Sequence, residues 1–263
     1  LDKLREPVRL RGGLDEDKNL SDEVRQRALS CLQRFGERIR DFSSADVAAV
    51  GTNTLRATRK VRRFLDQAEH ALGHPISVIS GREEARLIYL GVSHTLAEND
   101  TRRRFVMDIG GGSTELTFFS KGKIIASKSF KMGTVRTIDK ETHKEINKKI
   151  KSWIENKSEG LSKIALIGSG GNINKIFKMS TRAEGKPLSY IYMRAHYKFL
   201  KQMTYEQLIS ELGLNPDRAD VIIPASKIYI NAMKWSGAKN IYVPKIGLAD
   251  GIIKALHSGK LDE

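Results

Sequence analysis

The hydrophobic positions of the chain form short apolar runs that alternate with longer segments of helical spacing. Apolar runs that end in glycine or polar residues predict buried strands, and apolar residues that recur every three or four positions predict helices. The predicted strands are 47–50, 76–79, 105–107, 113–119, 123–129, 164–167 and 241–243. The predicted helices are about 21–39, 56–72, 81–90, 139–154, 172–176, 218–233 and 248–256. This alternation of elements is typical of an α/β protein.

Local signals refine this pattern. Ser21 precedes Asp22 and Glu23, and a capping hydroxyl followed by acidic residues predicts a helix start. Arg218 is predicted to open a long helix, whereas residues 180–216 are predicted to be irregular and only partly helical. The polar segment Asn99–Arg104 predicts a linker, so we expect two domains.

The stretch Phe105–Leu116, FVMDIGGGSTEL, joins a buried strand to a candidate anion site. Asp108 lies at the strand end, and three glycines at 110–112 leave the turn without side chains, so backbone N–H groups can approach a ligand closely. Asp108 and Ser113 can hold a hydrated Mg²⁺ and a phosphate oxygen. Taken alone, the motif fits a glycine-rich hairpin turn with a capping aspartate about equally well.

A second glycine loop follows the predicted strand 164–167. Residues 168–172 read GSGGN and precede a predicted helix, an arrangement that again suits an anion. The spacing is not that of a Walker A loop, and no ribose-binding acid follows at the distance expected for a dinucleotide site. Two such loops in one chain are harder to explain by coincidence than a single loop would be.

Two further segments carry candidate catalytic side chains. Arg56 follows a strand, a glycine and two threonines at the predicted start of a helix, which suits a phosphate. Without other support, the segment alone favours a surface arginine on an N-capped helix over a phosphate site. Glu83 and Glu84 fall in the first turn of the helix after strand 76–79. Either carboxylate can simply stabilise the helix through its interaction with the helix dipole. Alternatively, one of them can lie over the strand ends and act as a general base.

Composition narrows the functional classes. The chain has 263 residues, 40% hydrophobic and 29% charged, which suits a globular protein with a sizeable core. Its formal net charge of +15 favours polyanionic ligands. The basic residues are scattered as well as clustered, and a solvated basic surface accounts for most of them. We expect no dedicated nucleic-acid site. The absence of a long apolar run and of a signal peptide, with Cys31 as the single cysteine, favours a cytoplasmic protein. The six histidines show no pairing suited to zinc.

The motifs occur in a recognisable order. They are V-R-L at 8–10, G-T-N-T-L-R at 51–56, S-G-R-E-E-A-R at 80–86, D-I-G-G-G-S-T-E at 108–115, M-G at 132–133, G-S-G-G at 168–171, R-A-D at 218–220 and G-L-A-D-G at 247–251. As a set they resemble the Ppx/GppA family of exopolyphosphatases and guanosine pentaphosphate phosphohydrolases over nearly the whole chain.

This resemblance implies two RNase H-like α/β lobes of the actin-like ATPase superfamily with a cleft between them. It assigns residues 1–101 to lobe I and residues 102–247 to lobe II, with the C-terminal helix 248–263 packed on lobe I. It also implies Mg²⁺-dependent hydrolysis of the terminal phosphoanhydride bond of polyphosphate or guanosine pentaphosphate, and suggests a homodimer.

The family's functional residues carry over by motif. Glu84 matches the catalytic base, Asp108 the Mg²⁺-associated aspartate, and Glu115 a nearby acidic residue that matters for catalysis. Arg56 matches the arginine that holds the outgoing phosphate. The two phosphate loops match Gly110, Gly111, Gly112 and Ser113, and Gly168, Ser169, Gly170 and Gly171.

One departure keeps other functions open. The family's first phosphate loop, a D-x-G-S-N-S strand and hairpin, does not occur in this sequence. A protein without it would lack a metal-binding aspartate, which favours a catalytically silent polyphosphate-binding or alarmone-binding regulator. The presence of Glu84 and Asp108 favours the hydrolase instead. The E-E-A-R block at 83–86 argues against a third alternative, an ATP-dependent kinase or chaperone-like ATPase.

Overall fold

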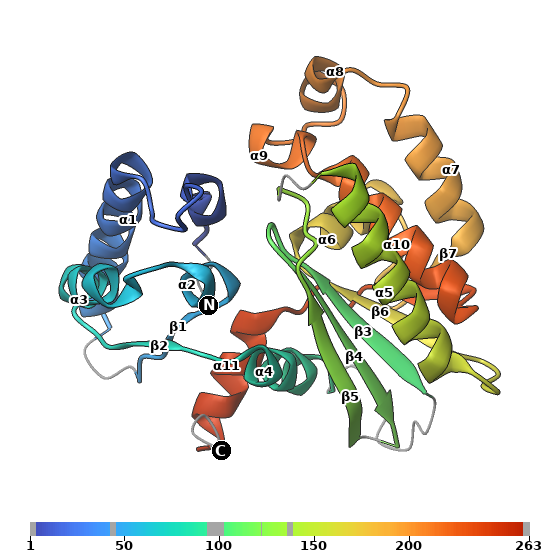
Figure 1. Cartoon of the computed structure of the whole chain (residues 1–263), viewed down its shortest axis with the longest axis horizontal. Helices are drawn as coiled ribbons and strands as arrows, with labels where there is room; N and C mark the ends of the chain where they lie inside the picture. Colours follow the sequence, from blue (N-terminus) through green and yellow to red (C-terminus); the bar gives the residue numbers. More distant parts are fainter. Residues whose placement is uncertain (1–3, 43–45, 94–102, 122, 136–138, 260–263) are drawn as a thin grey trace. The chain divides into compact units, whose positions relative to one another are not determined.

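The computed structural model describes residues 4–42, 46–93, 103–121, 123–135 and 139–259. Contacts divide the chain into two compact units, the first made of residues 1–84 and 255–263 and the second of residues 85–254. Figure 1 labels the helices and strands of both units. Residues 99–102 of the predicted linker lie outside the described residues.

The first unit contains a two-stranded parallel sheet with helices packed beside it. Its elements are η1 (Leu10–Gly13), α1 (Asp22–Arg40), β1 (Ala49–Gly51), α2 (Asn53–Ala57), α3 (Val61–Leu72) and β2 (Ile76–Val78). Ala28 of α1 and Leu55 of α2 form its core with Phe64, Leu65 and Ala68 of α3. The predicted start of the first helix is confirmed, because the Ser21 hydroxyl caps it by accepting a hydrogen bond from the Val24 amide at 3.4 Å.

The single helix predicted for residues 56–72 was wrong. It divides into α2 and α3, because Thr58 is extended and Lys60 has a left-handed backbone with φ of 52°. Arg56 therefore lies in the last turn of the short helix α2, not at the start of the long one.

The second unit is built on a six-stranded sheet of order β5-β4-β3-β6-β8-β7. Its strands are β3 (Arg104–Ile109), β4 (Thr114–Ser120), β5 (Lys123–Phe130), β6 (Ala165–Ser169), β7 (Leu188–Ser189) and β8 (Asn240–Tyr242). Strands β3, β6 and β8 are parallel, and β4 and β5 form the predicted antiparallel hairpin. Its helices are α5 (Lys140–Ser158), α6 (Gly171–Met179), α7 (Tyr190–Leu200), α8 (Tyr205–Ser210), α9 (Pro216–Ala219) and α10 (Ile222–Ser236).

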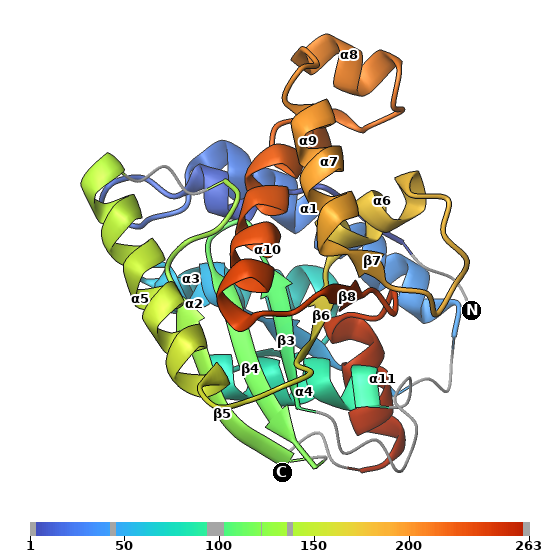
Figure 2. The same cartoon turned by 90° about the vertical axis from the view of Figure 1, so that its right-hand side faces the viewer.

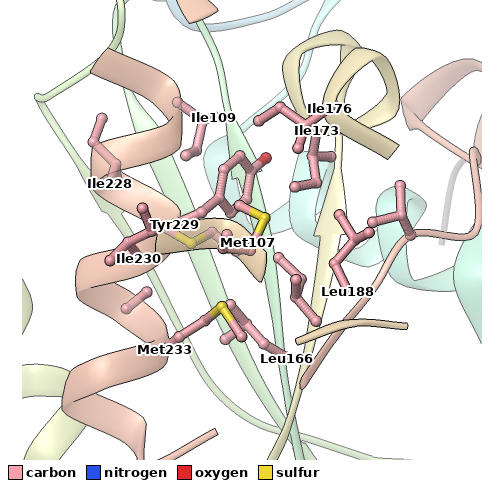
Figure 3. Close-up of a cluster of buried hydrophobic side chains, with 14 of the residues drawn as sticks. Met107, Ile109, Leu166, Ile173, Ile176, Leu188, Ile228, Tyr229, Ile230 and Met233 are labelled. Atoms are coloured by element: carbon pink, nitrogen blue, oxygen red, sulfur yellow. The ribbon is translucent and has the colours of Figure 1, made fainter. Parts of the chain in front are cut away.

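Helices α5, α6 and α10 cover one face of this sheet. Figure 2 shows α5 and α10 in front of β3 and β4. Their buried side chains, such as Ile154 of α5 and Tyr229 of α10, join Phe105 and Met107 of β3 in one apolar core. Figure 3 shows Tyr229 and Met233 packed among Met107 and Leu166 of the sheet. This burial stabilises the sheet that carries both glycine loops.

The opposite face packs against α4 (Gly81–Ser93) and α11 (Leu248–His257). Val106, Phe119 and Ile167 of the sheet form a second cluster with buried side chains of α4 and with Leu248. The rings of Tyr89 and Phe119 stack with centroids 3.9 Å apart. These contacts belong to the second unit, although the sequence analysis placed both helical segments with lobe I; the proposed lobe boundaries stay predictions.

One sequence-based assignment in the C-terminal half needs correction. Arg218 does not open the long helix, because α9 ends at Ala219 and α10 begins at Ile222. Pro224 explains the break, since its ring would clash with the carbonyl four residues earlier in a continuous helix. Residues 180–216 contain the helices α7 and α8 between irregular segments, as predicted. Among the described helices, none is long and apolar enough to cross a membrane.

The close approach of α4 and α11 yields a test of this packing. A Cβ added at Gly251 would lie 1.8 Å from the Leu87 carbonyl oxygen of α4, whereas one at Gly12 would meet no heavy atom within 4 Å. Because backbone must move to accommodate the methyl group, we expect Gly251→Ala to lower the free energy of unfolding by about 1–3 kcal/mol. Gly12→Ala should cause no loss. Denaturant unfolding of both variants measures the difference, and equal stabilities would contradict the packing.

Candidate functional site

Four polar residues form one row across the sheet of the second unit. Asp108 of β3 is in register with Glu115 of β4, and Glu115 with Ser129 of β5. On the other side Asp108 is in register with Ser169 of β6. Paired residues on neighbouring strands project to the same face of a sheet, so the row brings two carboxylates and two hydroxyls together. Figure 1 shows the four strands that carry it.

The two carboxylates make this row a charged site inside an apolar sheet. Residues directly opposite on antiparallel strands have Cβ atoms about 4.5–5.5 Å apart, and like charges there repel each other. Asp108 is half-buried and Glu115 is only 5% exposed. Burial weakens the screening of this repulsion by water, so hydrogen-bond donors or a cation must offset it.

Two serine hydroxyls supply donors to Glu115. The Ser113 hydroxyl donates to Glu115 Oε1 at 2.5 Å, and the Ser129 hydroxyl donates to the same oxygen at 2.9 Å. Ser113 is 2% exposed, so its side chain is turned into the protein toward Glu115. A direct contact between the Ser113 hydroxyl and a phosphate, as the motif predicts, would require that hydroxyl to turn away from Glu115.

The first glycine loop is held by the segment after β5. The Thr134 amide donates to the Gly110 carbonyl at 3.1 Å, and the Val135 amide to the Gly111 carbonyl at 2.9 Å. Gly133 packs directly on the loop, because a Cβ there would lie 2.5 Å from the Gly111 carbonyl carbon. The M-G motif therefore fixes the position of the loop at 110–112.

The second glycine loop closes around Asp108. Gly170 has φ of 95°, which favours glycine, and a Cβ there would lie 2.5 Å from Asp108 Oδ1. Because β3 and β6 are adjacent and parallel, both glycine loops leave the sheet at the same edge. Helix α6 begins within this loop, at Gly171. The carboxyl ends of parallel strands are where open α/β sheets bind ligands.

Tyr229 holds the end of β6 in place. Its hydroxyl is fully buried and donates to the Ser169 carbonyl at 2.8 Å. Burial raises the pKa of Tyr229 well above its usual value, and the negative charge of Asp108 raises it further. The hydroxyl therefore remains a protonated donor. The Ser169 hydroxyl in turn donates to the Ile246 carbonyl at 3.1 Å, which ties β6 to the segment before α11.

The side chain of Arg218 places a positive charge at the start of α6. Arg218 Nη1 donates to Asn172 Oδ1 at 3.1 Å, and a Cβ at Gly171 would lie 2.3 Å from Arg218 Nη2. A guanidinium and a helix N-terminus both favour an anion. The sequence analysis did not name Arg218, Ser129 or Tyr229 as site residues. Only Arg218 had a sequence signal, the R-A-D motif.

The first unit holds the remaining candidates. Arg56 Nη2 and Glu84 Oε2 form an ion pair at 2.9 Å, and Arg56 Nη1 donates to the Ile79 carbonyl at 2.7 Å. Glu84 is 7% exposed. The structure thus brings the predicted base and the predicted phosphate-holding arginine into direct contact. The predicted site residues form two groups, this pair in the first unit and the two carboxylates with the glycine loops in the second.

The donor set of the second unit fits Mg²⁺. No group of three or more His, Cys, Asp or Glu side chains is placed to enclose a metal ion among the described residues. Mg²⁺ does not need such an enclosure, because it usually binds one or two carboxylates and completes its shell with water and substrate phosphates. Asp108 matches that mode of binding, because its side chain is half-buried and Glu115 lies beside it in the sheet.

Together the fold and site define an α/β protein with two glycine-lined loops suited to phosphate beside a pair of carboxylates. The model of the Ppx/GppA phosphatase family matches residues 1–258, so the chain belongs to that family. The resemblance stated from the motifs is confirmed.

Similar proteins support the same placement. The chain is 47% identical to the guanosine-5'-triphosphate,3'-diphosphate pyrophosphatase of Vibrio vulnificus and 46% to that of Aliivibrio fischeri, over 137 residues in each case. These matches cover 52% of this chain and 27% of each relative.

The chain is also similar in structure to an exopolyphosphatase from Cytophaga hutchinsonii (TM-score 0.81, 22% identity, 96% of this chain and 88% of that one). A Ppx/GppA family member from Aquifex aeolicus gives a TM-score of 0.76 at 21% identity and covers 96% and 87%. These structures confirm the α/β fold.

Gly133 allows the support of the first loop to be tested. Gly133→Ala should lower the free energy of unfolding by about 1–3 kcal/mol, because its methyl group would overlap the loop backbone. Gly110→Ala is the matched control for stability, since its Cβ would meet only the Ser113 carbonyl oxygen at 3.5 Å, an ordinary contact. Chemical denaturation compares them, and a larger loss in Gly110→Ala would refute this description of the loop.

Tyr229 predicts a pH dependence of stability. Its pKa is raised on folding, so above about pH 10 the unfolded chain releases this proton before the folded protein does, and stability falls as pH rises. Tyr229→Phe removes this contribution. The free energy of unfolding between pH 9 and 11 should therefore fall less steeply in Tyr229→Phe than in the wild type, by up to about 1.4 kcal/mol per pH unit. Tyr205→Phe, at an exposed tyrosine, is the control for the loss of a tyrosine hydroxyl elsewhere in the protein.

Proposed function

We propose that the protein hydrolyses the terminal phosphoanhydride bond of a linear phosphate chain in the presence of Mg²⁺. The observation that carries this proposal is the meeting of two glycine loops at one sheet edge, with Asp108 against Gly170. A phosphoryl group in transfer spreads negative charge over its oxygens, and fixed backbone donors stabilise that charge best when no side chain keeps them away.

The second unit would bind the transferred phosphoryl group. Backbone N–H groups of both loops and the N-terminus of α6 favour an anion, and Arg218 adds a positive charge there. Asp108 would hold the Mg²⁺, and Glu115 lies directly beside it in the sheet. When bound, Mg²⁺ supplies positive charge that offsets the charge of the phosphate oxygens.

The first unit would supply the base. Glu84 Oε2 is paired with Arg56, so in this state the carboxylate oxygen is already engaged. A substrate phosphate that binds Arg56 would compete with Glu84 for the guanidinium. Glu84 could then accept a proton from the attacking water while Arg56 holds the phosphate that leaves. The ion pair thus gives Arg56 and Glu84 linked roles in binding and proton transfer.

Guanosine pentaphosphate is the substrate that we propose first. The relatives at 46–47% identity are named for hydrolysis of that guanosine compound. The chain spans only about a quarter of the length of those relatives, so the activity of the whole protein is itself part of the proposal. Inorganic polyphosphate is the alternative substrate of the same reaction, and the net charge of +15 suits either polyanion.

The test is release of orthophosphate from guanosine pentaphosphate and from long-chain polyphosphate with Mg²⁺. We expect Glu84→Gln to lower kcat by roughly 10²–10⁴-fold, the usual contribution of a general base. Glu83→Gln is the matched control, since it removes the same charge from the adjacent residue in the first turn of α4 and should keep wild-type activity.

Each outcome bears on a separate part of the proposal. Full activity in Glu84→Gln would remove Glu84 from the mechanism. Tight binding of either polyanion by a wild-type protein that releases no phosphate would replace the hydrolase with a silent polyanion-binding regulator. Release from polyphosphate alone would exchange the proposed substrate while keeping the reaction.

A further inference from the structure

Helix α7 exposes a row of apolar side chains. Ile191 is 80% exposed and Phe199 is 47% exposed, and Ala195 between them is exposed as well. Residues four apart lie on the same side of a helix, so the three side chains form one row along α7. The helix begins directly after β7, the edge strand opposite β5 in the sheet, and packs on α10 (Figure 1). Exposed apolar side chains grouped in this way mark a contact surface, whereas single scattered ones do not.

Basic side chains lie along one side of this row. Arg194 and Lys198 are four residues apart on α7, and Lys201 follows three residues later. Lys227 of α10 meets Lys201 at one aromatic ring, because the Nζ atoms of Lys227 and Lys201 lie 5.7 and 6.0 Å from the ring centroid of Tyr197. A ring orients a cation without neutralising its charge. These contacts therefore leave the positive charge available to an anion outside the protein.

The chain around α7 and α10 contains no acidic residue to offset this charge. No Asp or Glu occurs at residues 185–205 or 221–249. Glu184, just outside the first segment, pairs with Lys245 at 3.7 Å, and Glu155 and Glu159 of α5 line a shallow hollow together with Lys234. The positive charge that remains is therefore concentrated on α7 and at the adjacent Lys227. The basic residues of the two segments are Lys186, Arg194, Lys198, Lys201, Lys227, Lys234, Lys239 and Lys245.

A hollow beside Ile191 extends the apolar surface. Its volume is about 530 Å³, and residues of α7, the end of α10 and the start of β8 line it. Tyr190, Ile191, Met233 and Ala238 give it apolar walls, and Lys239 also lines it. A ligand that suits this surface has apolar groups and negative charges side by side. A bilayer of anionic phospholipids has both, because its acyl chains lie beneath a layer of phosphates.

We propose that this surface binds a bilayer that contains anionic phospholipids. We call it the α7 face, and its residues are Ile191, Arg194, Ala195, Lys198, Phe199, Lys201 and Lys227. Ile191 and Phe199 enter the boundary between headgroups and acyl chains, and the cations bind the headgroup phosphates. Binding of this kind holds a protein on the surface of a membrane without a membrane-spanning helix.

The charge and the apolar row together favour a bilayer over other occupants. A second copy of the chain would bring the same cations opposite each other, and like charges across an interface repel. An inorganic phosphate chain would pair with the cations but leave Ile191 and Phe199 in water. The inference is independent of the proposed function, because the α7 face shares no residue with the candidate site and binding is measured without turnover.

The first experiment tests the apolar row. The protein is sedimented with vesicles of phosphatidylglycerol and phosphatidylcholine in equal parts, and with vesicles of phosphatidylcholine alone. We expect binding to the anionic vesicles, weakened by roughly 5–10-fold in Ile191→Gln, because an apolar side chain no longer leaves water. Ile253→Gln is the matched control, since Ile253 is a helical isoleucine of α11 that is 62% exposed, and it should bind as the wild type does.

The second experiment tests the charges with the same vesicles. Each basic residue near an anionic surface contributes about 1 kcal/mol, so removal of two charges in Lys198→Gln/Lys201→Gln should weaken binding by about 25-fold. The matched control, Lys148→Gln/Lys149→Gln, removes two exposed lysines from α5 and leaves the same net charge. We expect it to retain nearly wild-type binding. Far-UV circular dichroism of every variant verifies the fold.

A third measurement detects insertion directly. Tryptophan favours the membrane interface, so Ile191→Trp should bind more tightly than the wild type, and brominated acyl chains should quench its added fluorescence. Ile253→Trp should show no quenching beyond that of the wild type, which reports Trp153 and Trp235. A gain of binding in Ile191→Trp cannot come from loss of folding.

Several outcomes would overturn the inference. These are absence of binding to anionic vesicles, equal binding to vesicles of phosphatidylcholine alone, or equal losses in the α7 and control variants. Binding that depends on charge but is unchanged in Ile191→Gln and unquenched in Ile191→Trp would also overturn it. Binding to single-stranded RNA or to polyphosphate without Mg²⁺, with none to vesicles, would replace the bilayer with a phosphate polymer.

Discussion

The repulsion between two carboxylates inside an apolar sheet is the constraint on which the second unit depends. Asp108 and Glu115 stand opposite each other on β3 and β4, while helices cover both faces of the sheet around them. A protein that needed only stability would place apolar residues here, because paired like charges destabilise a sheet. The surrounding structure offsets the repulsion with donors, and the remaining negative charge favours a cation at the ends of the strands.

The neighbouring elements are arranged around this charge. Gly170 leaves space for Asp108, which no residue with a Cβ could do at that distance. Tyr229 is held protonated below the loop and secures the end of β6 through the Ser169 carbonyl. Gly133 packs closely on the backbone of the first loop and so fixes its position. The apolar packing of α10 against β3 and β6 therefore does more than stabilise the unit, since it also fixes the backbone that would bind phosphate.

The sequence predicted those parts of the site that are local in the chain. The strand before Asp108, the hairpin after it and both glycine loops follow from apolar runs and glycine spacing, and the structure has each of them. The meeting of the two loops depends on the pairing of β3 with β6, which lie more than 50 residues apart, and no local pattern encodes that register. The family resemblance supplied what local spacing could not.

The contacts that were missed have physical reasons. Ser129 looked like an ordinary edge-strand residue because its importance comes only from its register with Glu115. Tyr229 looked like a core residue, which it is, and its hydroxyl contact depends on how α10 crosses the sheet. The division of residues 56–72 into α2 and α3 was missed because the helical spacing of apolar residues continues across a left-handed Lys60, a residue without a conformational signature in sequence.

The central claim is that water attacks the terminal phosphorus of a phosphate chain held by the glycine loops. The most direct measurement is hydrolysis of guanosine pentaphosphate and of polyphosphate in H₂¹⁸O with Mg²⁺, followed by mass analysis of the products. The account predicts that each turnover places one ¹⁸O atom in the released orthophosphate and none in the shortened chain. Label in the shortened chain, or turnover that yields pyrophosphate, would contradict attack at the terminal phosphorus and the site built around it.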